Sequence, residues 1–435
     1  MYFLTKVFWV SILLWAVSFN SSAAQTIQLS DLLRDADARN PSLQVSSEQI
    51  AVAKSKIDQV TSLPDPILSI SLLNYPIDEF KTNRTPMTGN EIRLAQKFPF
   101  PGKLDTKGKI AAQKSRWFAS VHQDARLQIR QQVKDAWYQL LFQRQAIELT
   151  NRNLKILDDF VRLTETRYEV GKGLQQNVLK AHLQLSKQLE MLLGLQQKEA
   201  ATQATLNSLA GHNTDEELAI EATLEATLDA TTTSFNLRDL QQSAEQNRPM
   251  FASFGALIEQ YTAQRKLARL DYKPDFTLWA GYRWRDDALA DGGTDFISTG
   301  ISFNLPLRKA RRSAAVVEAD SALRLAHQKR NDFRNKTYLM IHRSLTRFEQ
   351  ASKLVELYRE GIIPQATQTL QATMSAYQVD KVDFLSLLDA AMSLYRYEID
   401  YARTLRDQQR SQAQIEAAAG LDVGQLEPLP KSVKG

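Results

Sequence analysis

The sequence has no cysteine among its 435 residues. This absence excludes disulfide bonds, thiolate metal sites, a cysteine nucleophile and a lipid-modified cysteine at a processed N-terminus. Glycine and proline are scarce, at 16 and 13 residues, so most of the chain is free to form helix. An excess of one charge is also missing, because 54 lysines and arginines against 49 aspartates and glutamates leave a net charge of +5. Such an even balance argues against nucleic acid as a partner.

Long apolar runs are absent outside the N-terminus. Lys6 precedes an apolar run over residues 7–19, and the small residues Ser-Ala-Ala end at Ala24. These features predict a cleaved signal peptide, 1–24, and a mature chain, 25–435. An uncleaved signal anchor is the alternative. It is disfavoured because a helix needs about 20 apolar residues to span a bilayer, and this run has 13.

Catalytic motifs are equally absent. The chain contains neither His-Glu-x-x-His nor Gly-x-Ser-x-Gly, and the glycine-containing stretch 102–108 is not a phosphate-binding loop, because isoleucine follows Lys109 where serine or threonine is required. The five histidines lie far apart in the sequence and the methionines do not cluster. We therefore expect no enzyme activity, no metal site and no cofactor.

An internal duplication dominates what is present. Residues 29–33 (LSDLL) return 208 positions later as residues 237–241 (LRDLQ), and each copy is followed by an alanine and a proline. The period is too long for a solenoid repeat. It predicts two structural halves, 25–236 and 237–420, and a C-terminal tail, 421–435. Further pairs at nearly the same offset are Pro64-Asp65 with Pro274-Asp275, Pro101 with Pro306, Tyr168 with Tyr377, and Gly211 with Gly420.

The sequence of each half predicts a short helix followed by a long pair of helices. Within 103–167, apolar residues recur every seven positions, which is the pattern of a coiled-coil seam. A helix of this length is a rod of roughly 100 Å at 1.5 Å per residue. The long pairs span 103–211 and 307–420, and a linker, 212–236, joins the halves. The seam residues are Val133, Leu140, Ile147, Leu154 and Val161. The predicted helices are 29–62, 103–167, 175–211, 237–271, 307–373 and 382–420, with a kink or a break at Pro364.

The segments between the short helices and the long pairs have a period of two. In 66–76, apolar residues at 68, 70 and 72 alternate with Ser69 and Ser71, which predicts a strand. The predicted strand hairpins occupy 66–99 and 275–305. Their strands are close to the 9–11 residues that cross a bilayer as tilted strands, and long polar connections favour that interpretation. Ordinary hairpins of a soluble domain are the alternative.

Four strands cannot close a barrel, because the smallest membrane barrels have eight. An open edge in hydrocarbon leaves backbone groups unpaired at several kcal/mol each, so membrane insertion requires several chains to pool their strands. Proline-containing turns mark the change from strand to helix, where a missing N–H costs nothing. The turn residues are Pro99, Pro101, Gly102 and Pro306. Basic residues just beyond the turns, expected to meet either lipid phosphates or solvent, are Lys103, Lys107, Arg308, Lys309, Arg311 and Arg312.

Together these features resemble the TolC-like outer-membrane efflux proteins, over essentially the whole mature chain. The resemblance rests on the signal peptide, the order of elements in both halves, FPFPGKL at 98–104, KPDF at 273–276, and Tyr-x11-Asp-Ala-x3-Leu-Tyr at 377–395. It implies a mainly α fold with a β-barrel portion. Four transmembrane strands from each chain of a homotrimer would form a twelve-stranded barrel in the outer membrane of a Gram-negative bacterium, continued by a periplasmic tunnel of α-helical hairpins. Implied partners are outer-membrane lipid, a periplasmic adaptor (membrane fusion) protein and an inner-membrane pump of the resistance-nodulation-division type.

The resemblance also implies a periplasmic gate. In the family, the inner helix of the second half carries carboxylates where the tunnel narrows. Asp389 matches one such carboxylate and Tyr377 a latch residue, whereas Ser386 stands at the other carboxylate position, and Asp380 and Asp383 lie closer to the helical tip. A solvated helix residue is the alternative for Asp389. The hairpin tips, implied to contact the adaptor, are Gly171, Lys172, Gly173 and Lys381.

The expected function is a passive exit duct that carries substrates from adaptor and pump to the exterior. The FPFPGKL turn is similar to that of members serving heavy-metal exporters, so heavy-metal cations are the expected cargo. A multidrug or type I secretion duct of the same family is one alternative. A soluble periplasmic coiled-coil scaffold is the other.

Overall fold

The computed structural model describes residues 26–227 and 235–421. The predicted signal peptide, 1–24, and nearly all of the tail, 421–435, lie outside the described residues. The first half contains α1 (Leu29–Arg39), α2 (Pro41–Thr61), β1 (Ile67–Leu73), β2 (Gly89–Phe98), α3 (Lys103–Glu169) and α4 (Gln175–Ala210). The second half contains α5 (Leu237–Asn247), α6 (Pro249–Leu270), β3 (Phe276–Trp284), β4 (Phe296–Phe303), α7 (Lys309–Leu357), α8 (Ile363–Gln378) and α9 (Phe384–Ala419).

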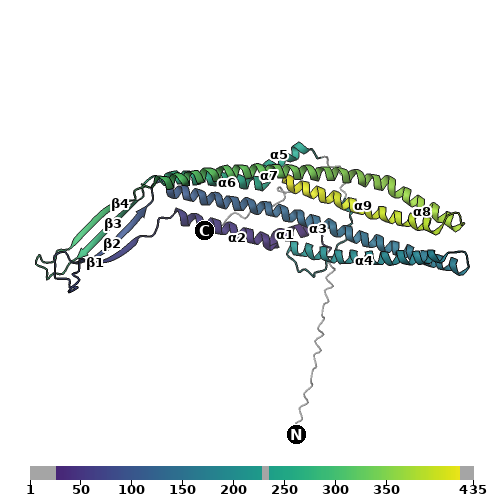
Figure 1. The fold of residues 1–435 in the computed structure, drawn as a ribbon, viewed down its shortest axis with the longest axis horizontal. Coiled ribbons are helices and arrows are strands. Elements are labelled where there is room, and N and C mark those ends of the chain that lie inside the picture. Colours follow the sequence, from purple (N-terminus) through teal and green to yellow (C-terminus); the bar gives the residue numbers. More distant parts are fainter. Residues whose placement is uncertain (1–25, 228–234, 422–435) are drawn as a thin grey trace, which may run out of the picture.

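The molecule is a long rod (Figure 1). The four strands lie at one end, and the turns that join α3 to α4 and α8 to α9 lie at the other. The α3 helix alone has 67 residues, about 100 Å at 1.5 Å per residue. It packs against α2, α4, α6 and α9, so it holds the two halves together. The predicted mainly helical fold with four strands and long helical pairs is confirmed.

Each opening helix is broken in two, which corrects the single helices expected over 29–62 and 237–271. Pro41 and Pro249 are the first residues of α2 and α6. The preceding residues, Asn40 and Arg248, have extended backbones with ψ of 121° and 120°. A proline disfavours the helical conformation in the residue before it and cannot donate a backbone hydrogen bond, so α1 and α5 end there.

These two breaks receive the ends of the long helices. Gly211 and Gly420 terminate α4 and α9 in the left-handed conformation, with φ of 75° and 70°. A Cβ atom on Gly211 would lie 2.9 Å from the Arg39 carbonyl oxygen, and one on Gly420 would lie 2.8 Å from the Arg248 amide nitrogen. Both the backbone conformation and the close approach require glycine. The same contact in both halves is what the duplication predicts.

The predicted kink at Pro364 is a π-helical turn. Residues Tyr358–Ile362 form this wider turn between α7 and α8, and Pro364 is in the first turn of α8. The proline ring clashes with the carbonyl group one turn earlier and offers no N–H, and a π turn accommodates such an interruption within a continuous helix. The long helix of the second half therefore continues past the proline through a π turn and is not broken there.

The buried residues of α3 do not follow the predicted seven-residue repeat along the whole helix. Val133, Leu140 and Val161 are buried as predicted, whereas Ile147 and Leu154 are half-buried. A straight helix turns about 20° per heptad relative to an exact 3.5-residue repeat, so the contact face moves to neighbouring positions. In the middle of the helix these positions are Ala146, Thr150, Asn153 and Leu157.

The strands form one antiparallel sheet in the order β1-β2-β3-β4. The halves meet where β2 pairs with β3, with Phe98 opposite Phe276 and Leu94 opposite Ala280. One face carries exposed apolar side chains such as Ile70, 71% exposed, and Ile301, 52% exposed. Within the described chain, β1 and β4 each have one edge without a strand partner. No helix of the described segments is long and apolar enough to cross a membrane.

Candidate functional site

The two hairpin tips are built on equivalent turns. In the first tip, Gly171 has φ of 72° and the Lys172 N–H donates to the Arg167 carbonyl oxygen at 2.8 Å. In the second tip, Asp380 takes the glycine position with φ of 56°, and the Lys381 N–H donates to the carbonyl oxygen of residue 376 at 2.9 Å. Aspartate tolerates the left-handed conformation better than most side chains. Both lysines are exposed and accessible to a partner.

Gly173 shapes the first tip by its lack of a side chain. A Cβ atom at this position would lie 3.0 Å from the Tyr168 amide nitrogen and 3.1 Å from the Arg167 carbonyl carbon. The turn therefore folds closely over the end of α3. The counterpart in the second tip is Val382, which packs against the apolar cluster beneath the tips.

Arg167 joins the two tips within one chain. Its guanidinium forms an ion pair with Asp380, donates to the Tyr377 carbonyl oxygen at 3.1 Å and lies 4.3 Å from the centroid of the Tyr377 ring. The predicted gate residues Tyr377 and Asp380 are thus brought together by an arginine that sequence reasoning missed. Nothing in its sequence context distinguishes Arg167 from other charged residues of α3.

Tyr377 and its counterpart Tyr168 differ in burial. Tyr377 is 5% exposed, whereas Tyr168 is 49% exposed. The Tyr377 ring packs against Phe384, which in turn meets Phe160 of α3 edge to face at a centroid distance of 6.0 Å. Burial raises the pKa of the Tyr377 hydroxyl, although the adjacent Arg167 charge opposes this. Tyr377 therefore stays neutral and anchors the second tip on the first.

Asp383 and Ser386 form the N-terminal cap of α9. The Ser386 N–H donates to the Asp383 carboxylate at 2.9 Å, and the Ser386 hydroxyl donates to the same oxygen. Hydrogen bonds from the Ser386 side chain and backbone hold the pKa of Asp383 below its ordinary value. This carboxylate accepts one of the free N–H groups of the first helical turn, and the Ser386 hydroxyl reinforces the cap.

Asp389 lies three residues beyond Ser386, on the same side of α9. Its side chain is exposed. Within the described chain it is without an ion pair or a hydrogen bond, in contrast to Asp380 and Asp383. Of the acidic residues predicted for the gate, it is therefore the one whose charge is left for solvent or for another chain.

The strand-to-helix turns are held by Lys103 and Asp275. Gly102 caps α3 with φ of 87°, directly after Pro99 and Pro101. The Lys103 ammonium, 7% exposed, lies 2.9 Å from the Asp275 carboxylate, which also accepts from the Phe100 N–H at 2.9 Å. Although burial opposes it, these hydrogen bonds hold the pKa of Asp275 below its ordinary value. The expectation that Lys103 meets lipid or solvent is wrong.

The other basic residues near the turns differ among themselves. Arg312 donates to the Asp271 carbonyl oxygen at 2.7 Å and thereby ties α7 to the end of α6. Exposed basic side chains beside the turns are Lys107, Arg308, Lys309 and Arg311. Pro306 precedes α7 as predicted, and its ring is half-buried. Two residues before it, the Asn304 side chain accepts a hydrogen bond from the Asp275 N–H.

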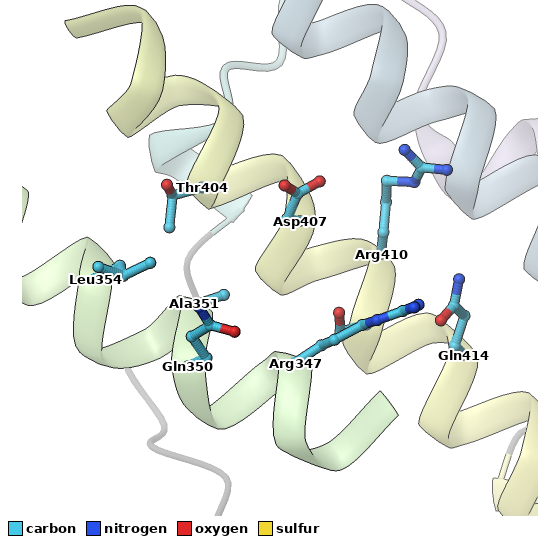
Figure 2. A pocket seen from close by; sticks show the side chains of 9 residues that line it. Arg347, Gln350, Ala351, Leu354, Thr404, Asp407, Arg410 and Gln414 are labelled. Carbon is cyan, nitrogen blue, oxygen red and sulfur yellow. The ribbon is translucent and has the colours of Figure 1, made fainter. Parts of the chain in front are cut away.

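A groove of about 420 Å³ lies between α7 and α9. Figure 2 shows Arg347 of α7 along the groove and Arg410 of α9 turned out of it. Arg410 pairs with Asp135 of α3, and Asp407 accepts from the neighbouring Arg406 at 2.7 Å. The groove lacks a nucleophile next to a base, so its geometry offers no catalytic arrangement. In the described segments, histidines and carboxylates do not gather in a metal-binding group.

Comparison with known proteins gives the family. The model of the outer membrane efflux protein family matches residues 32–212 and 240–421, one match in each half. The chain belongs to the outer membrane efflux protein family. It is 21% identical over 406 residues to the cobalt-zinc-cadmium resistance protein CzcC of Cupriavidus metallidurans, covering 92% of both chains.

Solved structures show the same fold. The outer membrane protein VceC of Vibrio cholerae matches with a TM-score of 0.74 and 21% identity, over 92% of this chain and 97% of that one. A membrane protein of Pseudomonas aeruginosa matches with a TM-score of 0.78 and 15% identity, over 90% and 92%. As a member of the outer membrane efflux protein family, the protein is an outer-membrane channel of a Gram-negative tripartite efflux system, with its helical tunnel in the periplasm. It is not an enzyme, and the soluble scaffold is excluded.

Replacing Arg167 with alanine is expected to loosen the contact between the tips. The exposed Asp380 contributes little as an ion-pair partner, so the loss comes mainly from the hydrogen bond and the ring contact, about 1–2 kcal/mol together. Amide hydrogen exchange over residues 376–383 should become roughly 5–30 times faster. Arg162→Ala, which removes an exposed pair with Asp158 one turn away, is the matched control. Equal exchange in both variants would contradict this role for Arg167.

Proposed function

We propose that the protein works as a homotrimeric exit duct. The observation that carries the proposal is the four-stranded sheet of the described residues, which has an unpaired edge on each side and lies at the end of the rod opposite the helical tips (Figure 1). Backbone groups cannot remain unpaired in hydrocarbon. Joining β4 of one chain to β1 of the next removes both edges, and three chains supply twelve strands, enough for a membrane barrel.

The two faces of the sheet support this assembly. The apolar side chains of β1, such as Leu68 and Ile70, are on the same face as Leu94 and Ile92 of β2, directly opposite in register. The face continues across β3 and β4 through the pair Tyr282 and Ile297. An apolar outer face with a polar inner face is the alternation of a membrane barrel.

Detergent-extracted protein should therefore be a trimer in native mass spectrometry. A chain with Ile70→Pro, which removes a backbone N–H donor from β1, is expected to shift the population toward monomer, because proline interrupts strand pairing. Ile70→Val, which keeps the strand, is the matched control. A wild-type protein found only as monomer or dimer would refute the twelve-stranded assembly.

We propose that the periplasmic gate lies at the tips. Arg167, Tyr377 and Asp380 hold the two hairpins of one chain together, while Asp389 contributes an uncompensated carboxylate that three chains would bring into a ring. A ring of negative charges favours cations in a narrow pore. Asp383 and Ser386 fix the start of α9, so they act on the gate by holding this helix in position.

Asp389→Asn is expected to weaken cation preference without changing assembly. The substitution removes one negative charge per chain and keeps the side-chain shape. The readout is the reversal potential of single channels in a planar bilayer under a salt gradient, with Asp159→Asn on the exposed face of α3 as the matched control. An unchanged reversal potential would remove Asp389 from the gate.

The exposed tips are the proposed contact for a periplasmic adaptor. Lys172 and Lys381 project at the end of the rod, on rigid turns formed by Gly171, Gly173 and Asp380. Rigid turns limit the conformational entropy lost on docking. An inner-membrane pump, for which we propose the resistance-nodulation-division type, would supply the energy, and opening would follow when the hairpins separate.

Heavy-metal cations are the proposed cargo, on the strength of the likeness to the cobalt-zinc-cadmium resistance protein CzcC. A strain lacking this protein should lose tolerance to zinc, cobalt or cadmium, and the wild-type gene should restore it. Growth in multidrug-efflux substrates and the secretion of proteins are measured in parallel. A defect confined to drugs or to secretion would replace the metal assignment with that of the alternative ducts.

A further inference from the structure

The polar face of the sheet carries a basic cluster that the duct function does not use. Residues of this face alternate with the apolar ones, and their charged members are Glu91, Arg93, Lys97 and Arg283. Three positive charges thus accompany one negative charge in the strands. If the apolar face meets lipid, this face lines the lumen of the barrel, because strand residues alternate between the two sides.

Trp279 lies flat against the wall on this face. It is opposite Gly300 in the register of β3 and β4, and a Cβ atom on Gly300 would lie only 2.6 Å from the Trp279 ring. The indole therefore occupies the space that the missing side chain leaves. A larger residue at position 300 would force the ring out into the lumen.

The guanidinium of Arg93 covers this ring. Its central carbon lies 3.6 Å from the Trp279 ring centroid, the distance of a stacked cation–π contact. Arg93 is opposite Gly281 in the register of β2 and β3, so the arginine can lean over the sheet toward the tryptophan. The stack of Gly300 backbone, indole and guanidinium places a cationic plane at the surface of the wall.

Arg93 differs from the other charges of the cluster in having no counterion. Arg283 pairs with Glu91 at 3.5 Å, and Lys97 pairs with Asp275 at 3.6 Å. Among the described residues, no carboxylate pairs with Arg93. The cation–π contact orients the guanidinium but does not neutralise its charge, so the charge remains available to a solute.

We propose that Arg93, stacked on Trp279, forms with its two copies a basic ring that concentrates anions at the wall of the barrel lumen. This inference rests on the proposed trimer, since the ring needs three chains. Rings of arginine or lysine favour anions in pores, and the planar guanidinium suits carboxylate and phosphate groups. The tip, with Asp389, and the barrel would then favour opposite charges.

Quenching of Trp279 fluorescence by ions tests the ring directly and does not depend on whether the tips are open. Purified trimer in detergent at about 0.01 M ionic strength, where the Debye length is about 30 Å, is titrated with iodide and with caesium. The Trp279 signal is the difference between wild type and Trp279→Phe. Trp284→Phe, which removes the tryptophan on the apolar face, is measured alongside. It shows which part of the fluorescence belongs to Trp284 and which to Trp279.

The ratio of iodide quenching to caesium quenching at Trp279 should be at least about twofold higher in the wild type than in R93Q, since a unit charge at contact distance in water changes the local concentration of a monovalent ion roughly fivefold. R93K should keep the wild-type ratio. Sodium chloride at about 1 M, where the Debye length is about 3 Å, should lower the wild-type ratio to that of R93Q. K54Q, at an exposed position of α2, removes the same charge outside the sheet and should change nothing.

An iodide-to-caesium quenching ratio that is the same in the wild type and in R93Q would overturn the ring. A trimer in native mass spectrometry would at the same time leave the proposed duct intact. Protection of Trp279 from both ions in a trimer would show that this face does not line the lumen, and would also overturn it. Absence of the trimer itself would refute the proposed function and the ring together.

Discussion

The unpaired backbone groups along the outer edges of β1 and β4 are the constraint on which the rest of the structure depends. Each such group costs several kcal/mol in hydrocarbon, and one chain offers no further strand among its described residues to satisfy them. A member of an outer-membrane family with this sheet must complete it with other chains. The rod of helices then follows the geometry of that assembly, because α3 and α7 continue directly from β2 and β4.

The strand-to-helix junction transmits this geometry into the periplasm. Lys103 and Asp275 come from different halves of the chain, yet their ion pair of 2.9 Å is nearly buried at the start of α3. A charge pair so shielded is costly to break by removing one partner, so the pair fixes how the first long helix leaves the sheet. The proline-rich turn provides the change of direction, and the buried ion pair provides its rigidity.

The duplication explains why the two halves have the same architecture. The places where the two halves differ explain the contact between the hairpin tips. Both long pairs end in equivalent turns, and both opening helices are broken at an equivalent proline. Burial has diverged, however, because Tyr377 is packed between the hairpins while Tyr168 faces solvent. Arg167 has no counterpart of the same charge, since residue 376 is alanine. The first tip therefore holds the second through the contacts of Arg167 with Tyr377 and Asp380. Two exactly symmetric hairpins would not form these contacts.

The sequence alone determined the duplication, the four strands, the long helices and the family, because periodicity and proline or glycine at turns act over a few neighbouring residues. It also predicted the positions of Tyr377 and Asp380, but not Arg167, which meets them across more than 200 residues. It assigned Lys103 to the surface, since nothing local shows that Asp275 will lie beside it. The tertiary structure decided these pairings, and it decided that Arg93 would lie on Trp279, because contacts between distant segments depend on the register of the sheet and the packing of the helices.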